Sequence, residues 1–283
     1  MLRIYRKKFS AYLRIILILC ASACQTLKNS EQENKKEEDI LATQKSLVIN
    51  YINQGQPNMA LRELRPLEKS NPKDADLKNL MGLIYLSMQN AKGALVYFEE
   101  AYRLQPRAPI ALNLSSALIE SGQSVRATKI LKDLKKSPAG KNYQFPERIT
   151  HNIGLASERM NNLPMAEKYY KLALQENPYF YISLMRLGAV YEQMKKGGFA
   201  YQQYLKAREA CLKCFDPIQA AVQLQLKAGK AALAAKTVQD YLANKEIEAV
   251  DRAKAQRLLA SASKNSQQAK AAPGSPSKAQ SPR

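Results

Sequence analysis

The sequence predicts an all-α superhelix built from about six helix-turn-helix repeats and closed by a C-terminal capping helix. A spacing of 34 residues separates Tyr51 from Tyr85 and Pro72 from Pro106. Small and aromatic residues recur at fixed places between these markers. The chain has 283 residues, of which 46% are hydrophobic, so it is long and apolar enough for an extended core. A fixed period of this length is typical of stacked units that each contact only their neighbours.

Residues 1–23 have the composition of an export signal. Basic residues precede an apolar run that starts at Ile15, and small residues follow it. The run is too short for a membrane-spanning helix, which needs about 20 residues. We therefore expect residues 1–23 to be a cleaved signal peptide.

The end of this segment, Ala21-Ser22-Ala23-Cys24, resembles a bacterial lipobox. The resemblance implies that Cys24 is the lipid attachment site, carrying palmitate-type acyl chains. The residue after Cys24 is Gln25 and not an acidic residue, so the resemblance also implies sorting to the outer membrane. The lipoprotein would then be anchored on the periplasmic face of that membrane. The alternative is ordinary secretion, with Cys24 a spare thiol or removed.

Two polar segments flank the repeats. Residues 24–39 are almost entirely charged or amide-bearing towards their end, which predicts a flexible linker. Residues 263–283 combine Pro, Gly and Ser with four basic residues and no acidic residue, which predicts a disordered basic tail. The repeat region is thus expected at residues 40–262.

The repeats match the tetratricopeptide pattern, a pair of antiparallel helices with small residues where they cross. The most complete copy contains Gly82, Tyr85, Ala94, Phe98, Ala101 and Pro106. The fourth and fifth copies, which contain Gly154 and Gly188, are similar, whereas the first and third are weaker. A degenerate sixth pair is expected at Asp216–Asn244. Ile247–Ala262 is the expected capping helix.

Three features of the repeats have a mechanical interpretation. Gly82, like Gly154 and Gly188, should let the first helix approach the alanine of the second helix, here Ala94. The aromatic residue, here Phe98, should fill the wedge between repeats. Pro66 should kink its helix or end it early, because proline lacks an N–H and clashes with the preceding turn.

The chain is not expected to be an enzyme. It has one histidine, His151, no tryptophan, and no phosphate-loop, nucleophile-elbow, zinc-protease or dinucleotide motif. No cofactor, metal site or small-molecule substrate is expected. The net charge is +20, or +15 after removal of the signal peptide.

An insertion at Ser137–Arg148 separates the third and fourth repeats. It ends in Pro146-Glu147-Arg148, and Asn152-Ile153-Gly154-Leu155 opens the next repeat. These residues, with the lipobox and the repeat number, resemble the pilotin family of type IV pilus biogenesis proteins. The resemblance implies a lipoprotein that binds a secretin subunit as its protein client and assists secretin assembly and localisation in the outer membrane.

Two other functions stay open. The first is a lipoprotein scaffold that regulates peptidoglycan synthesis or outer-membrane protein assembly. The second is a cytosolic or nucleic-acid-binding adaptor, which only the positive charge favours. No nucleic-acid partner is expected, because the basic residues are dispersed and no base-stacking motif accompanies them.

Cys211 and Cys214 are candidates for a disulfide. An exported domain meets an oxidising compartment, and a spacing of three on a helix brings the two Cα atoms within reach of a bridge. Reduced thiols, a redox role and zinc binding are the alternatives. Zinc would need two more ligands, which the sequence does not place nearby.

The partner site is expected where positions five, nine and twelve of each first helix face the concave groove. The candidate groove residues are Lys45, Ile49, Ile52, Asn79, Leu83, Leu86 and Ile119. In the remaining copies these positions hold Leu112, Ser116, His151, Leu155, Glu158, Met185, Ala189 and Glu192. The N-terminal copies predict a mostly apolar client segment, oriented by Lys45 and Asn79. The alternative is that the repeats bury these side chains against one another.

Overall fold

The computed structural model describes residues 35–36 and 38–271, and all regular secondary structure in that part of the chain is helical. The predicted signal peptide and Cys24 lie outside the described residues. Within them, no helix is both long enough and apolar enough to span a bilayer.

The chain divides into two compact units, Met1–Gln105 and Pro106–Arg283. In the first unit a helix over residues 38–53 pairs with α2, and α3 pairs with α4: α2 is Pro57–Ser70, α3 is Ala75–Ser87 and α4 is Ala91–Leu104.

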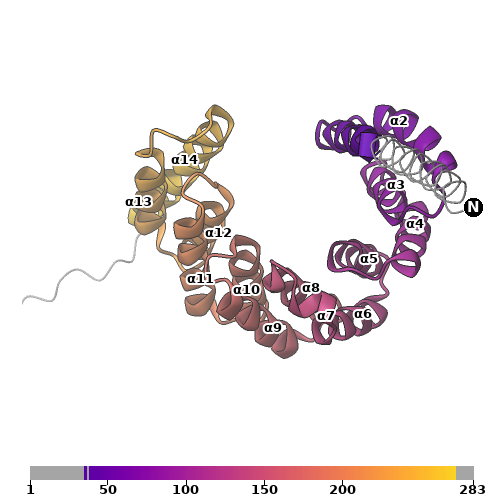
Figure 1. The fold of residues 1–283 in the computed structure, drawn as a ribbon. Helices are drawn as coiled ribbons and strands as arrows, with labels where there is room; N and C mark the ends of the chain where they lie inside the picture. Colours follow the sequence, from indigo (N-terminus) through magenta and orange to yellow (C-terminus); the bar gives the residue numbers. More distant parts are fainter. Residues whose placement is uncertain (1–34, 37, 272–283) are drawn as a thin grey trace, which may run out of the picture. The chain divides into compact units, whose positions relative to one another are not determined.

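The second unit continues the same alternation of paired helices and adds a short helix, α7, between α6 and α8 (Figure 1). Its helices are α5 Ala108–Glu120, α6 Ser124–Lys136, α7 Pro138–Lys141, α8 Pro146–Arg159, α9 Leu163–Glu176, α10 Tyr181–Gln193, α11 Gly197–Ala210, α12 Asp216–Lys227, α13 Ala231–Leu242 and α14 Ala249–Ala271. Within the described residues the helices form six pairs followed by α14, so the prediction of about six pairs and a capping helix is confirmed.

The turn inside each pair uses a left-handed residue at the same place. These residues are Gly55, Gln89, Gly122, Asn161, Lys195 and Gly229. Left-handed backbone lets a helix end and the chain reverse within a few residues, and glycine adopts it most readily. The recurrence of this conformation fixes the repeat register independently of the side-chain pattern.

Glycines at the same position of three first helices lie beneath aromatic rings of the second helices. A Cβ built on Gly82 would lie 2.5 Å from Phe98, one on Gly154 would lie 2.8 Å from Tyr170, and one on Gly188 would lie 2.4 Å from Tyr204. The groups nearest to each glycine are therefore the aromatic rings, which a larger side chain would displace. That the glycines also let the first helix approach the alanine of the second helix stays a prediction.

Pro66 does not end its helix early. It lies inside α2, which continues to Ser70. Its missing N–H removes one intrahelical hydrogen bond, and the four residues after it remain helical. The prediction of an early end is wrong, and that of a kink stays a prediction.

Two predicted boundaries differ from the structure. The first helix already includes residues 38–39, which were assigned to the linker, and α14 runs past Ala262 to Ala271. The sequence after Ala262 is polar but rich in Ala, Lys and Gln, which are good helix formers. Composition alone assigned these residues to the tail, whereas helix propensity lets α14 continue.

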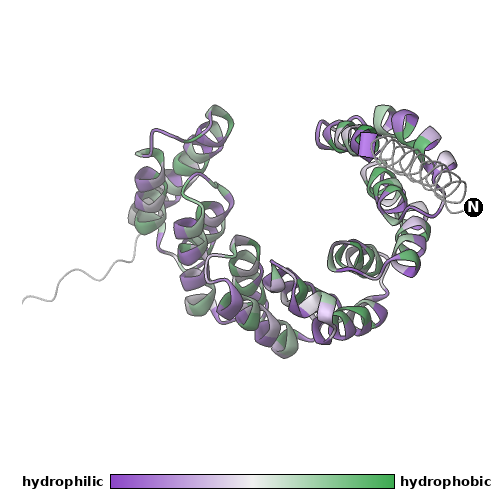
Figure 2. Ribbon diagram, in the orientation of Figure 1, coloured by the Kyte–Doolittle hydropathy of each residue, from purple (hydrophilic) through white to green (hydrophobic). Residues whose placement is uncertain are grey.

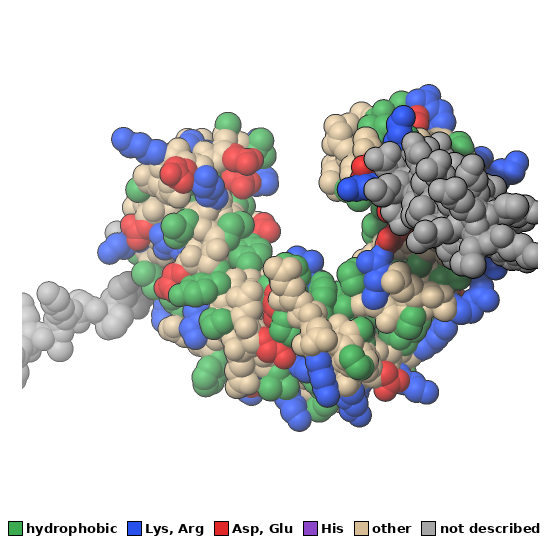
Figure 3. All heavy atoms as spheres, viewed as in Figure 1, with side chains coloured by type: hydrophobic (Ala, Val, Ile, Leu, Met, Phe, Trp, Pro, Cys, Tyr) green, Lys and Arg blue, Asp and Glu red, His purple; other side chains and the backbone are tan. Residues whose placement is uncertain are grey.

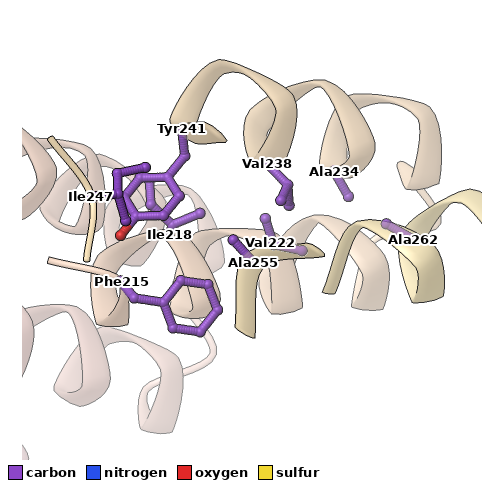
Figure 4. Packing of buried hydrophobic residues seen from close by; sticks show 9 residues of the cluster. All are labelled: Phe215, Ile218, Val222, Ala234, Val238, Tyr241, Ile247, Ala255 and Ala262. Carbon is purple, nitrogen blue, oxygen red and sulfur yellow. The ribbon is translucent and has the colours of Figure 1, made fainter. Parts of the chain in front are cut away.

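The last helix pair and α14 share one apolar core (Figure 4). Val222 of α12, Val238 of α13 and Ala255 of α14 are fully buried in it, and Tyr241 donates a 2.9 Å hydrogen bond to the Lys213 carbonyl. The apolar sides of the helices in each unit face the neighbouring helices (Figure 2). α14 therefore covers the apolar face that the sixth pair would otherwise expose.

Candidate functional site

A cavity of about 420 Å³ lies over the first helices of three consecutive repeats in the second unit. Its lining residues are Pro109, Leu112, Asn113 and Ser116 of α5, Tyr143 of the insertion, Arg148, His151 and Asn152 of α8, and Phe180 and Ile182 at the start of α10. Three of them, Leu112, Ser116 and His151, occupy groove positions that the sequence predicted for the third and fourth copies. This cavity is the candidate functional site.

The insertion folds against the cavity rather than forming an open loop. Ser137 caps α7 by accepting a 3.2 Å hydrogen bond from the Gly140 N–H. Gly140 is required there, because a Cβ at this position would meet the Leu134 carbonyl. Pro146 then starts α8, so Pro146-Glu147-Arg148 is the first turn of a helix. The turn between α7 and α8 brings Tyr143 to the cavity.

His151 is held rigidly in the wall of the cavity. It is 6% exposed, its Nδ1 lies 2.9 Å from the Ser183 Oγ, and its ring packs against Tyr170 and Phe180 at centroid distances of 5.2 and 5.4 Å. Burial, assisted by the Arg186 charge, lowers the pKa of His151 to about 4. His151 is therefore uncharged near neutral pH.

Arg148 supplies the positive charge of the cavity. Its guanidinium lies over the Phe145 ring, 5.0 Å from the centroid, and Phe145 contacts Tyr143 edge to face at 5.9 Å. Such stacking orients a guanidinium while leaving its N–H groups open to another partner.

Polar groups on the α5 side are joined to α8. The Asn152 amide donates long hydrogen bonds of 3.4 Å to the hydroxyls of Ser115 and Ser116. These contacts place an amide and a hydroxyl beside the apolar wall. The site can therefore offer hydrogen bonds to a peptide backbone as well as apolar contact.

The candidate groove residues of the first unit lie on the residue 38–53 helix and α3. Ile49 is 44% exposed, whereas Ile52, Leu83 and Leu86 are half-buried. Ile52 and Leu83 pack against a cluster that includes Val48 and Leu77. Their role in partner binding stays a prediction.

Lys45 and Asn79 are also half-buried. The Lys45 ammonium lies 2.8 Å from Asp74 and 3.8 Å from Asp76, so its charge is already balanced within the chain. This pairing reduces its capacity to orient a client.

Ile119 is not open to a partner, and its assignment to the groove is corrected. It is 3% exposed, because α5 is apolar on most sides and packs against both α6 and α8. In the same copy, Leu112 and Ser116 reach the cavity instead.

The carboxylates predicted for the groove in the fourth and fifth copies turn towards the second helix of their own repeat. Tyr170 donates a 2.6 Å hydrogen bond to Glu158, and Tyr204 donates a 2.7 Å hydrogen bond to Glu192. Gln225 of the sixth pair makes the equivalent 3.0 Å hydrogen bond with Thr237. Position twelve thus links the two helices of a repeat.

Each carboxylate also reaches the next repeat. Glu158 lies 3.5 Å from Arg186, and Glu192 lies 3.3 Å from Lys227. These tyrosine, glutamate and cationic side chains therefore join consecutive repeats, and the glutamates find their partners within the protein. The sequence could suggest this arrangement, because the polar pair replaces the apolar residues Leu86 and Phe98 at the same spacing.

Cys211 and Cys214 are joined as a disulfide in the structure, with their Cα atoms 5.4 Å apart. They lie in the turn between α11 and α12 rather than on a helix, because α11 ends at Ala210. The Cys214 N–H donates to the Cys211 carbonyl at 3.1 Å. Oxidation in the cell stays a prediction, and titration of free thiols in the unfolded, unreduced chain would test it.

The described residues contain no cluster of three or more His, Cys, Asp or Glu side chains that could hold a metal ion. Basic, acidic and apolar side chains are interspersed on the visible face of the second unit (Figure 3). The candidate site is therefore defined by the cavity and not by a cluster of charged ligands.

Comparison with known proteins supports the repeat assignment. The family model of the tetratricopeptide repeat matches residues 75–107. A comparison with curated proteins found no match.

Several solved structures share the fold. PilW, a widely conserved type IV pilus biogenesis factor, superposes with a TM-score of 0.63 at 19% identity, over 75% of this chain and 96% of PilW. PilF of Pseudomonas aeruginosa gives a TM-score of 0.59 at 16% identity, over 76% and 96% of the two chains. A tetratricopeptide repeat protein of Parabacteroides merdae gives 0.59 at 13% identity, over 78% and 84%. The chain therefore has the fold of a tetratricopeptide-repeat protein.

Proposed function

We propose that the chain is a lipid-anchored assembly factor that holds a protein client in the cavity over α5, α8 and α10 and assists type IV pilus secretin assembly. The cavity is the observation that carries this proposal. A pocket over the first helices of consecutive repeats, with apolar walls and a few polar groups, suits a peptide segment better than a reaction centre. His151 and Ser183 are hydrogen-bonded, but both side chains are buried, Ser183 completely, so this pair supports the wall of the cavity and does not present a nucleophile to a ligand.

The choice of a pilus client is supported by fold likeness and by sequence. PilW and the Pseudomonas PilF are each covered over nearly their whole length. The sequence Ala21–Cys24 favours a lipid anchor, and two or more acyl chains would hold the protein firmly, at about 0.8 kcal/mol per buried CH₂.

The test is affinity purification of the full chain from membranes, followed by mass spectrometry of the proteins that accompany it. We expect the chain in the outer-membrane fraction together with a secretin subunit. The Cys24→Ser variant should remain helical but move to the soluble fraction.

Two results would contradict the proposal. Sedimentation of Cys24→Ser with the membrane would exclude lipid at Cys24 as the anchor. Recovery of a peptidoglycan synthase or an outer-membrane assembly component in place of a secretin would support the scaffold function instead.

A further inference from the structure

We propose that the cavity recognises a client segment in which a carboxylate lies beside an apolar side chain, with Arg148 binding the carboxylate. The inference rests on the proposed function, because it names the chemistry of the segment that the client would present. It follows from the charge of the cavity, from the ion pairing of Arg148 compared with that of nearby cations, and from the apolar residues of the cavity wall.

The cavity carries one positive charge and no negative charge. No Asp or Glu is among its lining residues, and Arg148 and His151 are its basic groups. Because burial keeps His151 neutral, Arg148 alone sets the charge that a ligand meets. A ligand with one negative group would complement it.

Arg148 is left without a carboxylate, in contrast to cations on neighbouring repeats. Arg186 pairs with Glu158, and Lys135 lies 2.8 Å from Glu176. Among the described residues no carboxylate oxygen lies within 4.0 Å of the Arg148 guanidinium, although Glu147 is its neighbour in sequence. Glu147 is buried, whereas Arg148 is exposed.

The surroundings of Arg148 are apolar and partly open. Ile182 is 51% exposed in the cavity wall, and Phe145, beneath the guanidinium, is 38% exposed. Leu112 and Phe180 extend this wall. An apolar side chain of the client would cover these groups while its carboxylate meets Arg148.

A carboxylate fits the site better than a phosphate or a nucleic acid. One guanidinium with neutral amide and hydroxyl neighbours matches a single negative charge. Phosphate-rich ligands need several cations, and the lining supplies no second one. The carboxylate can come from an Asp or Glu side chain or from the end of a client chain.

Titration calorimetry with synthetic peptides tests this, using the mature Cys24→Ser chain. One probe is the N-acetylated, C-amidated peptide Gly-Leu-Phe-Asp-Gly, and its partner has Asn in place of Asp. The second pair is N-acetylated Gly-Gly-Leu-Phe with a free or an amidated C-terminus. We expect at least one carboxylate peptide to bind about tenfold more tightly than its amide counterpart, and the stronger pair identifies the source of the carboxylate.

Variants assign the effect to the cavity. Arg148→Gln should abolish the preference for the carboxylate, and Ile182→Ser should weaken both members of a pair. Lys141→Gln is the matched control, since it removes one exposed positive charge nearby without altering the lining, and it should retain the preference. Equal binding of carboxylate and amide peptides, a preference that survives Arg148→Gln, or no binding of any probe would overturn the inference.

The two proposals can fail separately. Recovery of a secretin together with equal binding of the paired peptides would remove the inference and leave the proposed function standing. An Arg148-dependent preference with no secretin recovered would remove the function and leave the carboxylate site.

Discussion

At the scale of single residues, the chemistry of the site depends on which side chains the repeats bury. His151 and Arg148 are three positions apart in one helix. His151 is buried and uncharged, whereas Arg148 is exposed and positively charged. The sequence identified His151 at a groove position but gave no indication of its burial. It is enclosed by side chains from later in the chain, namely Tyr170 of α9, Phe180 just before α10 and Ser183 of α10.

His151 should make folding stability depend on pH. Its folded pKa of about 4 lies below the usual value of 6.5, so between these values the unfolded chain binds more protons than the folded chain. Its contribution to stability is therefore complete above pH 6.5 and is lost as pH falls towards 4, by about 2 kcal/mol at pH 5.

Urea denaturation at pH 7 and pH 5 checks this expectation. The His151→Gln variant lacks the titrating group, so it should lose less stability than the unchanged protein over the same interval. An identical loss in both proteins would show that the carboxyl groups alone cause the pH dependence.

The glycines beneath the aromatic rings are the second residue-scale feature. Gly188→Ala would place a methyl group 2.4 Å from the Tyr204 ring, which must move. We expect a loss of about 1–3 kcal/mol in the free energy of unfolding, as for other overpacked cores.

Gly198→Ala in the adjacent helix is the matched control. A Cβ there meets nothing within 4 Å, and alanine favours a helix over glycine by up to about 1 kcal/mol. The control should be neutral or stabilising in the same denaturation experiment. Equal loss in both variants would contradict the packing interpretation.

At the scale of helices and repeats, position twelve connects the first helix to the second. The apolar pair Leu86 and Phe98 recurs as the hydrogen-bonded pair Glu192 and Tyr204. Burial, and the hydrogen bond to Glu192, raise the pKa of Tyr204, so the phenol stays protonated and donates. The periodicity of one helix predicts a groove position here, because it does not reveal a hydrogen-bond partner that lies on another helix.

A double-mutant cycle tests the exchange of one pair for the other. Tyr204→Phe should cost about 1 kcal/mol, and Glu192→Leu should cost about 1–3 kcal/mol because it leaves the phenol without its acceptor. The double variant reproduces the apolar pair, so it should be more stable than the sum of the single effects predicts, by about 1 kcal/mol. Lys227 is mostly exposed and can be hydrated when Glu192 is removed. Strict additivity would contradict a direct link.

Repeat number, helix order and capping were accessible from the sequence, because the 34-residue period and the small and aromatic residues report local geometry. The end of α14 was not, because the composition typical of disorder also favours an isolated helix. The cavity was found only in part. Leu112, Ser116 and His151 occupy groove positions of the repeat register, whereas Arg148 does not. Tyr143 reaches the cavity through the fold of the insertion and its α7 helix.

At the scale of the whole molecule, we propose that a protein client occupies the cavity over α5, α8 and α10, and that a lipid anchor at Cys24 keeps the assembly at the outer membrane. The fold alone does not name a client, since tetratricopeptide repeats serve many partners. The proposal therefore depends on contact between the client and the cavity wall in the living cell.

Site-specific photo-crosslinking tests that contact most directly. A photoreactive amino acid at Ile182, which is half-exposed in the cavity wall, should crosslink a secretin subunit in cells that assemble pili. The same amino acid at Val125, which is 74% exposed on α6 and does not line the cavity, is the control and should give no such product. A secretin crosslink from Val125 and none from Ile182, in folded and membrane-bound protein, would contradict the claim.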